Sequence, residues 1–151
     1  MKLTVRVQYA AARAGLPANS SIAKWAGAAL QGVRKKRMVL SVRLVGAKEG
    51  AILNRRYRAK PGPTNVLSFP FECPPGAHTD VLGDLVICAP VVRREASRQG
   101  KAERAHWAHM VVHGILHLRG YDHKNRRDAT NMEALEIRIL KGLGFPNPYV
   151  S

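Results

Sequence analysis

The sequence predicts a single domain in which one sheet is packed by helices. Its 151 residues fit one domain of ordinary size. Hydrophobic residues make up 46% of the chain, which is enough for a buried core and too many for a disordered basic tail. Segments with strand-like alternation and segments with helical spacing are interspersed, and we find no internal repeat and no low-complexity tract.

Four segments have the pattern of β-strands. Residues 2–8 and 38–45 alternate apolar and polar side chains, which is typical of strands with one buried face. The apolar run at residues 66–71 follows a turn-rich piece that contains prolines and a glycine. A further compact strand begins at Gly83 and includes residues 85–88.

Five segments have the apolar spacing of helices. The first is predicted to begin behind a cap at Ser20 or Ser21, and the last behind a cap at Asp128. Pro90 suits the first turn of the third helix because its fixed φ fits there, and Gly120 stops the fourth helix. The predicted helices cover residues 21–33, 48–58, 90–100, 103–118 and 128–142.

The chain is strongly basic, because 25 Lys and Arg against 10 Asp and Glu give a formal net charge of +15. Such a charge points to a polyanionic partner. Nucleic acid is favoured over an anionic membrane, since no long amphipathic basic helix stands apart from the core pattern. No run of about 18 apolar residues occurs and the N-terminus alternates in polarity, so we expect no membrane span and a cytoplasmic protein.

The histidines are the strongest chemical signal, because five of the six lie within one short stretch of the chain. On a helix His109, His113 and His117 share one face. His109 and His117 are then about 12 Å apart along the axis, too far for ligands that each lie about 2 Å from one metal ion. His113 and His117 are one turn apart and can bind the same ion. Gly120 allows the chain to turn back and bring in His123 as a third ligand.

This spacing of three histidines and a glycine is that of the metzincin zinc motif, H-E-x-x-H-x-x-G-x-x-H. Three imidazoles can hold Zn²⁺ with one position open to water, whose pKa falls from about 15.7 to about 7. Gly114 stands where the motif has its glutamate, so a peptidase would lack its general base. Cys73 or Cys88 could instead close the site around a structural metal. His106 and His109 are interpreted as residues that pack or support the ligands.

Basic residues offer a phosphate-binding partner for this site. Four cations lie in the six positions from Arg55 to Lys60, and an arginine that converged on the metal would bind a phosphate through two parallel hydrogen bonds. Tyr57 and Tyr121 are possible stacking partners for bases. Each basic cluster taken singly is typical of a solvated surface. Further clusters lie at residues 34–37, 93–94 and 124–127.

The run from His113 to His123, HGILHLRGYDH, resembles the H-G-x-L-H-L-x-G-Y-D-H signature of the YbeY family, which are bacterial endoribonucleases and ribosomal RNA maturation factors. Two further blocks agree with that family, within residues 53–70 and at residues 83–87, GDLVI. The resemblance covers about residues 50–145. Two departures are Asn65, where many members have an aspartate, and the basic run after the signature, where acidic residues are common.

The resemblance implies one zincin-like α+β domain over residues 1–151, with a small mixed four-stranded sheet packed with helices. It implies that His113, His117 and His123 bind one Zn²⁺ ion and that Arg58 is the functional arginine. The implied activity is that of a metal-dependent, single-strand-specific endoribonuclease in 16S ribosomal RNA 3′-end maturation and ribosome quality control. The implied partners are single-stranded RNA, 16S ribosomal RNA with the small ribosomal subunit, and a GTPase of the Era type.

The sequence leaves the nucleophile and its base open. In one hypothesis the metal activates water or polarises a phosphate oxygen, and Asp122 orients a histidine, accepts a proton or is only a turn residue. In another the RNA 2′-hydroxyl attacks and leaves a cyclic phosphate. A zinc peptidase is disfavoured by Gly114, and a second rival is a non-catalytic ribosome-assembly protein whose metal stabilises the fold.

Overall fold

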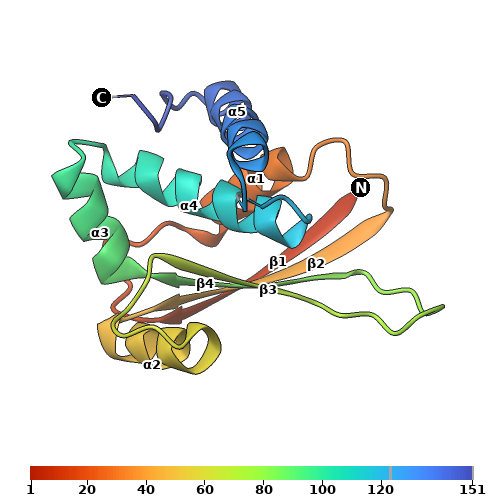
Figure 1. Cartoon of the computed structure of the whole chain (residues 1–151), viewed down its shortest axis with the longest axis horizontal. Coiled ribbons are helices and arrows are strands. Elements are labelled where there is room, and N and C mark those ends of the chain that lie inside the picture. The colour runs from red at the N-terminus through yellow and green to blue at the C-terminus, as the bar shows by residue number, and fades with distance from the viewer. Residues whose placement is uncertain (123, 151) are drawn as a thin grey trace.

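The computed structural model describes residues 1–122 and 124–150, and its centre is a four-stranded mixed sheet (Figure 1). The strands lie in the order β1-β2-β4-β3. β1, β2 and β4 are parallel to one another, and β3 at the edge is antiparallel to β4. The predicted mixed sheet is therefore confirmed. The strands are β1 (Lys2–Ala10), β2 (Arg37–Val45), β3 (Val66–Pro70) and β4 (Val81–Cys88).

Helices cover the two faces of the sheet unequally (Figure 1). α1 and α4 pack on one face, and α5 packs on α4 as an outer layer. α2 lies on the opposite face and covers only one end of it. None of the helices in the described part of the chain is long and apolar enough to cross a membrane. The helices are α1 (Asn19–Ala29), α2 (Ala47–Arg58), α3 (Ala89–Arg98), α4 (Glu103–Leu118) and α5 (Arg126–Gly142).

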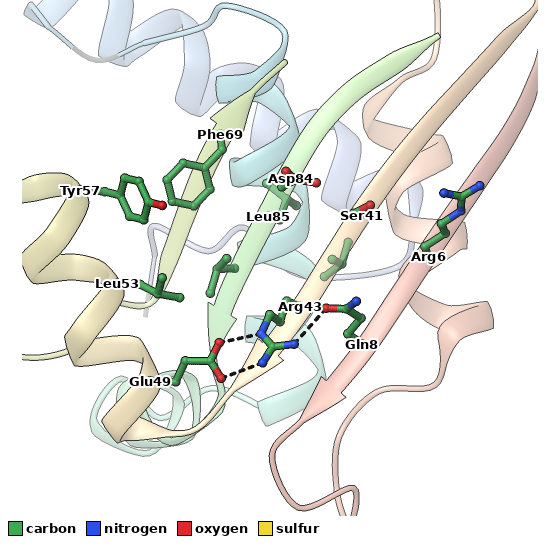
Figure 2. A pocket seen from close by; sticks show the side chains of 12 residues that line it. Arg6, Gln8, Ser41, Arg43, Glu49, Leu53, Tyr57, Phe69, Asp84 and Leu85 are labelled. Atoms are coloured by element: carbon green, nitrogen blue, oxygen red, sulfur yellow. Dashed lines mark hydrogen bonds and ion pairs between the residues drawn. The ribbon is translucent and has the colours of Figure 1, made fainter. Parts of the chain in front are cut away.

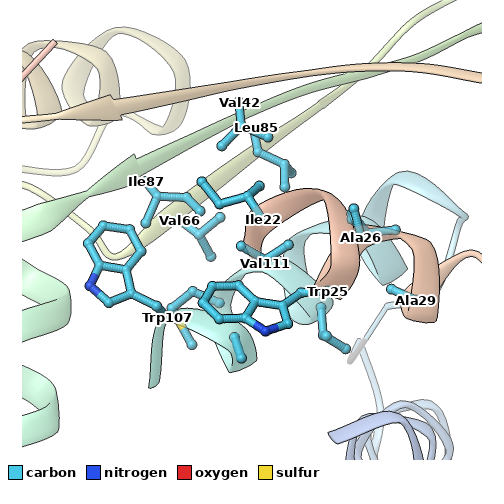
Figure 3. Close-up of a cluster of buried hydrophobic side chains, with 14 of the residues drawn as sticks. Ile22, Trp25, Ala26, Ala29, Val42, Val66, Leu85, Ile87, Trp107 and Val111 are labelled. Carbon is cyan, nitrogen blue, oxygen red and sulfur yellow. The ribbon is translucent and has the colours of Figure 1, made fainter. Parts of the chain in front are cut away.

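The core forms between the sheet and the α1–α4 layer. Alternation in β2 buries Leu40, Val42 and Leu44 on one face, as the period-two pattern predicts. These side chains meet those of β4, α1 and α4, among which Trp25 and Trp107 are fully buried (Figure 3). α4 is buried on almost every side, which explains why its sequence is apolar around most of its circumference.

Gly114 sets how closely α4 approaches the sheet. A Cβ atom at this position would lie 2.8 Å from Leu85 Cδ2 and 3.2 Å from Val66 Cγ2. The Ser68 hydroxyl of β3 donates to the Gly114 carbonyl at 3.0 Å, so the same point of the helix is also bonded to the edge strand. A larger residue here would push α4 away from β3 and β4.

Two helix caps differ from the predictions. α1 begins at Asn19 behind Ala18, with no side-chain cap, and ends at Ala29; the predicted cap at Ser20 or Ser21 and the extension to residue 33 are wrong. α5 is capped by Asn125, whose Oδ1 accepts from the Asp128 backbone N–H at 2.9 Å. Asp128 therefore lies in the first turn and is not the cap. Asn and Asp serve equally well as caps, so the pattern alone could not choose between them.

We predict that Gly114→Ala lowers the free energy of unfolding by roughly 1–3 kcal/mol, because the added methyl overpacks the helix–sheet contact. The matched control is Gly27→Ala in α1, where an added Cβ meets nothing within 4 Å. Gly27→Ala is expected to stabilise the protein by up to about 1 kcal/mol through helix propensity. Urea denaturation of both variants measures the difference, and equal stabilisation by the two changes would contradict the packing argument.

Candidate metal centre and adjoining cleft

His113 and His117 converge as the sequence predicts. They lie one turn apart on α4, both half-buried, and their Nε2 atoms are 3.1 Å apart. Two ligands that each lie 2.0–2.1 Å from a tetrahedral Zn²⁺ are about 3.3 Å apart, so this spacing suits a shared ion. The third predicted ligand, His123, lies outside the described residues.

A buried carboxylate lies behind this histidine pair. Glu136 of α5 is only 1% exposed, and its Oε2 atom is 2.6 Å from His109 Nε2 and 3.1 Å from His113 Nδ1. The Tyr149 hydroxyl donates to the other carboxylate oxygen at 2.7 Å. Burial alone would raise the pKa of Glu136, but the hydrogen bonds from His109 and His113 outweigh it and lower the pKa to about 2.

The ionised carboxylate fixes where the histidine protons are. A carboxylate can only accept hydrogen bonds, so His109 Nε2 and His113 Nδ1 must both carry a proton. A neutral His113 then has its lone pair on Nε2, the atom that faces His117. This is the carboxylate–histidine arrangement that orients metal ligands in many metalloproteins.

His109, His113 and Glu136 could themselves hold a metal ion, because each offers a ligand atom and these atoms lie within 4.8 Å of one another. A metal bound through the ring nitrogens that face Glu136 would replace the hydrogen-bonded network. One ring nitrogen of His113 cannot donate a proton to Glu136 and bind a metal at the same time. Among the described residues, the cluster that could hold a metal includes neither Cys73, which is exposed, nor Cys88, which is buried at the end of β4.

Sequence reasoning missed Glu136, although the pattern holds a signal for it. Glu136 comes four residues after Met132 and four before Leu140, both of which are 1% exposed. A carboxylate on the buried stripe of a helix requires partners, because an unpaired buried charge is costly. The sequence does not say which partners, since His109 and His113 lie more than twenty positions earlier.

A second hydrogen-bonded network holds His106 and Asn65. Glu95 of α3 is 3.0 Å from His106 Nε2, and Asn65 donates its amide to the same carboxylate at 3.1 Å. An aspartate at position 65 would place a second negative charge against Glu95 with no proton to donate. Burial lowers the pKa of His106. The interpretation of His106 and His109 as packing or supporting residues agrees with these contacts.

A cleft of about 650 Å³ opens beside His113 and His117, and Arg58 and Asp122 also line it. Edge strand β3 lines the cleft along its length, and residues of α4, on one face of the sheet, and of α2, on the other, line it as well. Arg58 is the last residue of α2, and the helix ends there because Ala59 adopts the left-handed conformation, with φ of 54°. Three neighbouring cations do not line this cleft: Arg55, Arg56 and Lys60.

The fold and this site together define a small α+β domain with a candidate metal centre beside an arginine-lined cleft. Residues 11–144 match the family model described as Endoribonuclease YbeY. The chain therefore belongs to the Endoribonuclease YbeY family.

Similar proteins named Endoribonuclease YbeY align along nearly the whole chain. The one from Nitrosococcus oceani is 52% identical over 153 residues, covering 100% of this chain and 99% of that protein. The one from Alkalilimnicola ehrlichii is 56% identical over 151 residues, covering 97% and 91%. The solution structure of TM1509 from Thermotoga maritima is 22% identical and has a TM-score of 0.56 over 98% of this chain and 100% of that one, which shows the shared fold.

We predict that Glu136→Gln weakens metal binding by about 10- to 100-fold, because the variant loses the charge that holds the His113 ring and its tautomer. Tyr149→Phe removes one hydrogen bond to the same carboxylate and is expected to change affinity in the same direction by less. Competition with a chromophoric chelator for Zn²⁺ measures both.

Glu72→Gln, at an exposed position after β3, is the control for loss of a carboxylate elsewhere. Circular dichroism establishes that each variant is folded before titration. Unchanged affinity in a folded Glu136→Gln variant would show that the carboxylate does not support the metal site.

Proposed function

We propose that this chain is a metal-dependent endoribonuclease that cuts single-stranded RNA. The observation that carries the proposal is the shared cleft, in which Arg58 and the His113–His117 pair face the same space in a member of an endoribonuclease family. The net charge of +15 supports a polyanionic substrate. Relatives that are 52–56% identical over nearly the whole chain bear the name of this activity.

The proposed metal is one Zn²⁺ ion held by His113, His117 and His123. The convergence of two Nε2 atoms and the proton that Glu136 keeps on His113 Nδ1 support this assignment. When bound in such a site, zinc supplies Lewis acidity and lowers the pKa of water toward about 7. Glu136 and His109 then hold the His113 ring in place from behind, and Tyr149 holds Glu136.

Arg58 is proposed to bind the scissile phosphate. Its guanidinium can donate two parallel hydrogen bonds to phosphate oxygens and stabilise the charge that develops on them during cleavage. Asp122 lines the same cleft, and its proposed role is to accept a proton or to orient a ligand; the alternative is that it is only a turn residue. If the RNA 2′-hydroxyl is the nucleophile, the product carries a 2′,3′-cyclic phosphate, and a 2′-deoxy nucleotide at the cut site blocks cleavage.

A zinc peptidase fits this chain less well. The peptidase glutamate would stand at position 114, where a side chain would run into Leu85 and Val66 of the sheet instead of lying in the cleft. The second rival, an assembly factor with a structural metal, predicts that metal removal unfolds the protein and that no RNA is cut.

The proposal includes the biological setting that the family resemblance implies. The substrate is the 3′ region of 16S ribosomal RNA, presented on the small ribosomal subunit during maturation and quality control in the cytoplasm. A GTPase of the Era type is the proposed protein partner. The arrangement of charges supports the RNA part of this setting, because Arg58 lines the cleft and the chain as a whole is basic.

We predict that His117→Ala abolishes high-affinity Zn²⁺ binding, whereas His109→Ala weakens it only about 10- to 100-fold, as expected for a residue that supports a ligand. Chelator competition on the two folded variants separates the alternative sites. A site built from His109, His113 and Glu136 would give the reverse order, with His117→Ala nearly unchanged.

We predict that Arg58→Ala lowers the rate of single-stranded RNA cleavage by about 10²- to 10³-fold, because one donor to the developing phosphate charge is lost. Arg55→Ala removes the same charge from the same helix outside the cleft and is expected to leave the rate within about twofold. Gel assays of a labelled oligonucleotide, with and without chelator, measure the rates of RNA cleavage. A peptide library incubated with the same protein tests for peptidase activity. If wild-type protein cuts RNA no faster than the folded His117→Ala variant, the proposed nuclease function is wrong.

A further inference from the structure

An exposed aromatic pair lies at the rim of the cleft. Tyr57, in the last turn of α2, is 57% exposed, and Phe69 of β3 is half-buried. Their ring centroids are 4.9 Å apart at an interplanar angle of 68°, an edge-to-face contact. Figure 2 shows the two rings side by side above Leu53, at the edge of the open face of the sheet.

The pair separates two hollows. Tyr57 and Phe69 line the cleft that contains His113 and Arg58. They also line a hollow of about 630 Å³ on the open face of the sheet, which extends across β4 and β2 to Arg6 of β1 (Figure 2). A polymer that leaves the cleft on this side passes over the two rings.

The charges close to the ring pair favour a base over a phosphate at this point, since Arg6 lies on β1, at the opposite edge of the sheet from β3. Asp84 lies directly opposite Phe69 in the β3–β4 register and is exposed. Arg43 is already paired with Glu49, at 2.6 Å, and contacts Gln8 (Figure 2). Negative charge next to the ring pair repels phosphate, whereas an aromatic ring offers a face on which any base can stack.

The contact with Phe69 also prepares Tyr57 for such a role. A ring fixed by an edge-to-face contact loses little conformational freedom when a ligand binds it. Tyr57 immediately precedes Arg58 in the chain, so one short segment presents a stacking surface and a phosphate ligand together. Tyr121, by contrast, does not line the cleft, and the Arg119 guanidinium lies over its ring, 5.5 Å from the ring centroid.

We propose that Tyr57, supported by Phe69, is the stacking site for the base next to the phosphate that Arg58 binds. The inference rests on the proposed nuclease function and names how the single strand is held. Stacking tolerates any base, so the site selects unpaired nucleotides over a particular sequence. A base in a duplex is already stacked on its neighbours and is not available to the Tyr57 ring.

The test is RNA binding by the metal-loaded protein, measured by fluorescence anisotropy at times too short for cleavage. Gel analysis of the same samples shows that the RNA is still uncut when the anisotropy is read. Tyr57→Ala is expected to weaken binding on the order of tenfold, and Tyr57→Phe to keep nearly all of it. Phe71→Ala is the matched control, because Phe71 is 50% exposed and lies outside both hollows. Its affinity is expected to match that of wild type.

The salt dependence distinguishes stacking from charge. Tyr57→Ala is expected to leave the slope of log K against log salt concentration unchanged. Arg58→Ala is expected to lower the magnitude of this slope by about one, the value for loss of one phosphate contact. If Tyr57→Ala does not fold, an oligonucleotide with one abasic position, moved along the strand, tests the same contact with wild-type protein. One abasic position is expected to reproduce the tenfold loss.

Wild-type affinity in Tyr57→Ala, with no sensitive abasic position and an intact Arg58 effect, overturns the stacking site and leaves the proposed nuclease standing. Absence of any RNA binding by wild-type protein overturns both. Loss of affinity in Tyr57→Ala together with an equal loss in Phe71→Ala would assign the effect to general surface hydrophobicity and also overturns the proposal.

Discussion

The bonded carboxylate of Glu136 is the interaction on which the candidate site depends. At 1% exposure its negative charge is tolerable only because His109, His113 and Tyr149 all donate to it. These donors tie together α4, α5 and the C-terminal segment, and Lys101 fastens that segment again by donating to the Pro148 carbonyl. Although Tyr149 is 45% exposed, desolvation of its hydroxyl beside the carboxylate of Glu136 raises the pKa of that hydroxyl, so it stays a donor. Parts of the chain far outside the histidine motif therefore orient His113, one of its candidate metal ligands.

The close approach of α4 to the sheet is the second constraint, and it explains how the cleft is assembled. With no side chain at Gly114, α4 lies against β3 and β4, and His113 comes to the edge of the sheet. Because β3 is the edge strand, α2 can reach around it from the opposite face and contribute Arg58. The histidine spacing alone does not bring an arginine to the candidate metal site. The edge position of β3 does, because helices on both faces of the sheet reach it there.

Local patterns predicted the order of strands and helices, because alternation in β2 and helical spacing in α4 follow from which side chains are buried. They failed where equivalent chemistry lies a few positions apart, as with Asn125 and Asp128 at the start of α5. They also failed for Glu136, whose partners come from another helix. Likewise the pattern of charges does not distinguish Arg58 from three neighbouring cations; the family resemblance selects it, and in the structure it alone of the four lines the cleft.

The positions of the acidic residues restrict the proton chemistry. Glu136 faces Nδ1 of His113, on the other side of the ring from Nε2, and its oxygens already accept three hydrogen bonds. Glu95 is similarly engaged by His106 and Asn65. Neither carboxylate can take a proton from a nucleophile in the cleft. Among the described residues that line the cleft, Asp122 is the acidic one. A nucleophile in the cleft, whether water or the RNA 2′-hydroxyl, therefore gives its proton to Asp122 or to solvent. The two nucleophiles give different products, because only the 2′-hydroxyl leaves a cyclic phosphate.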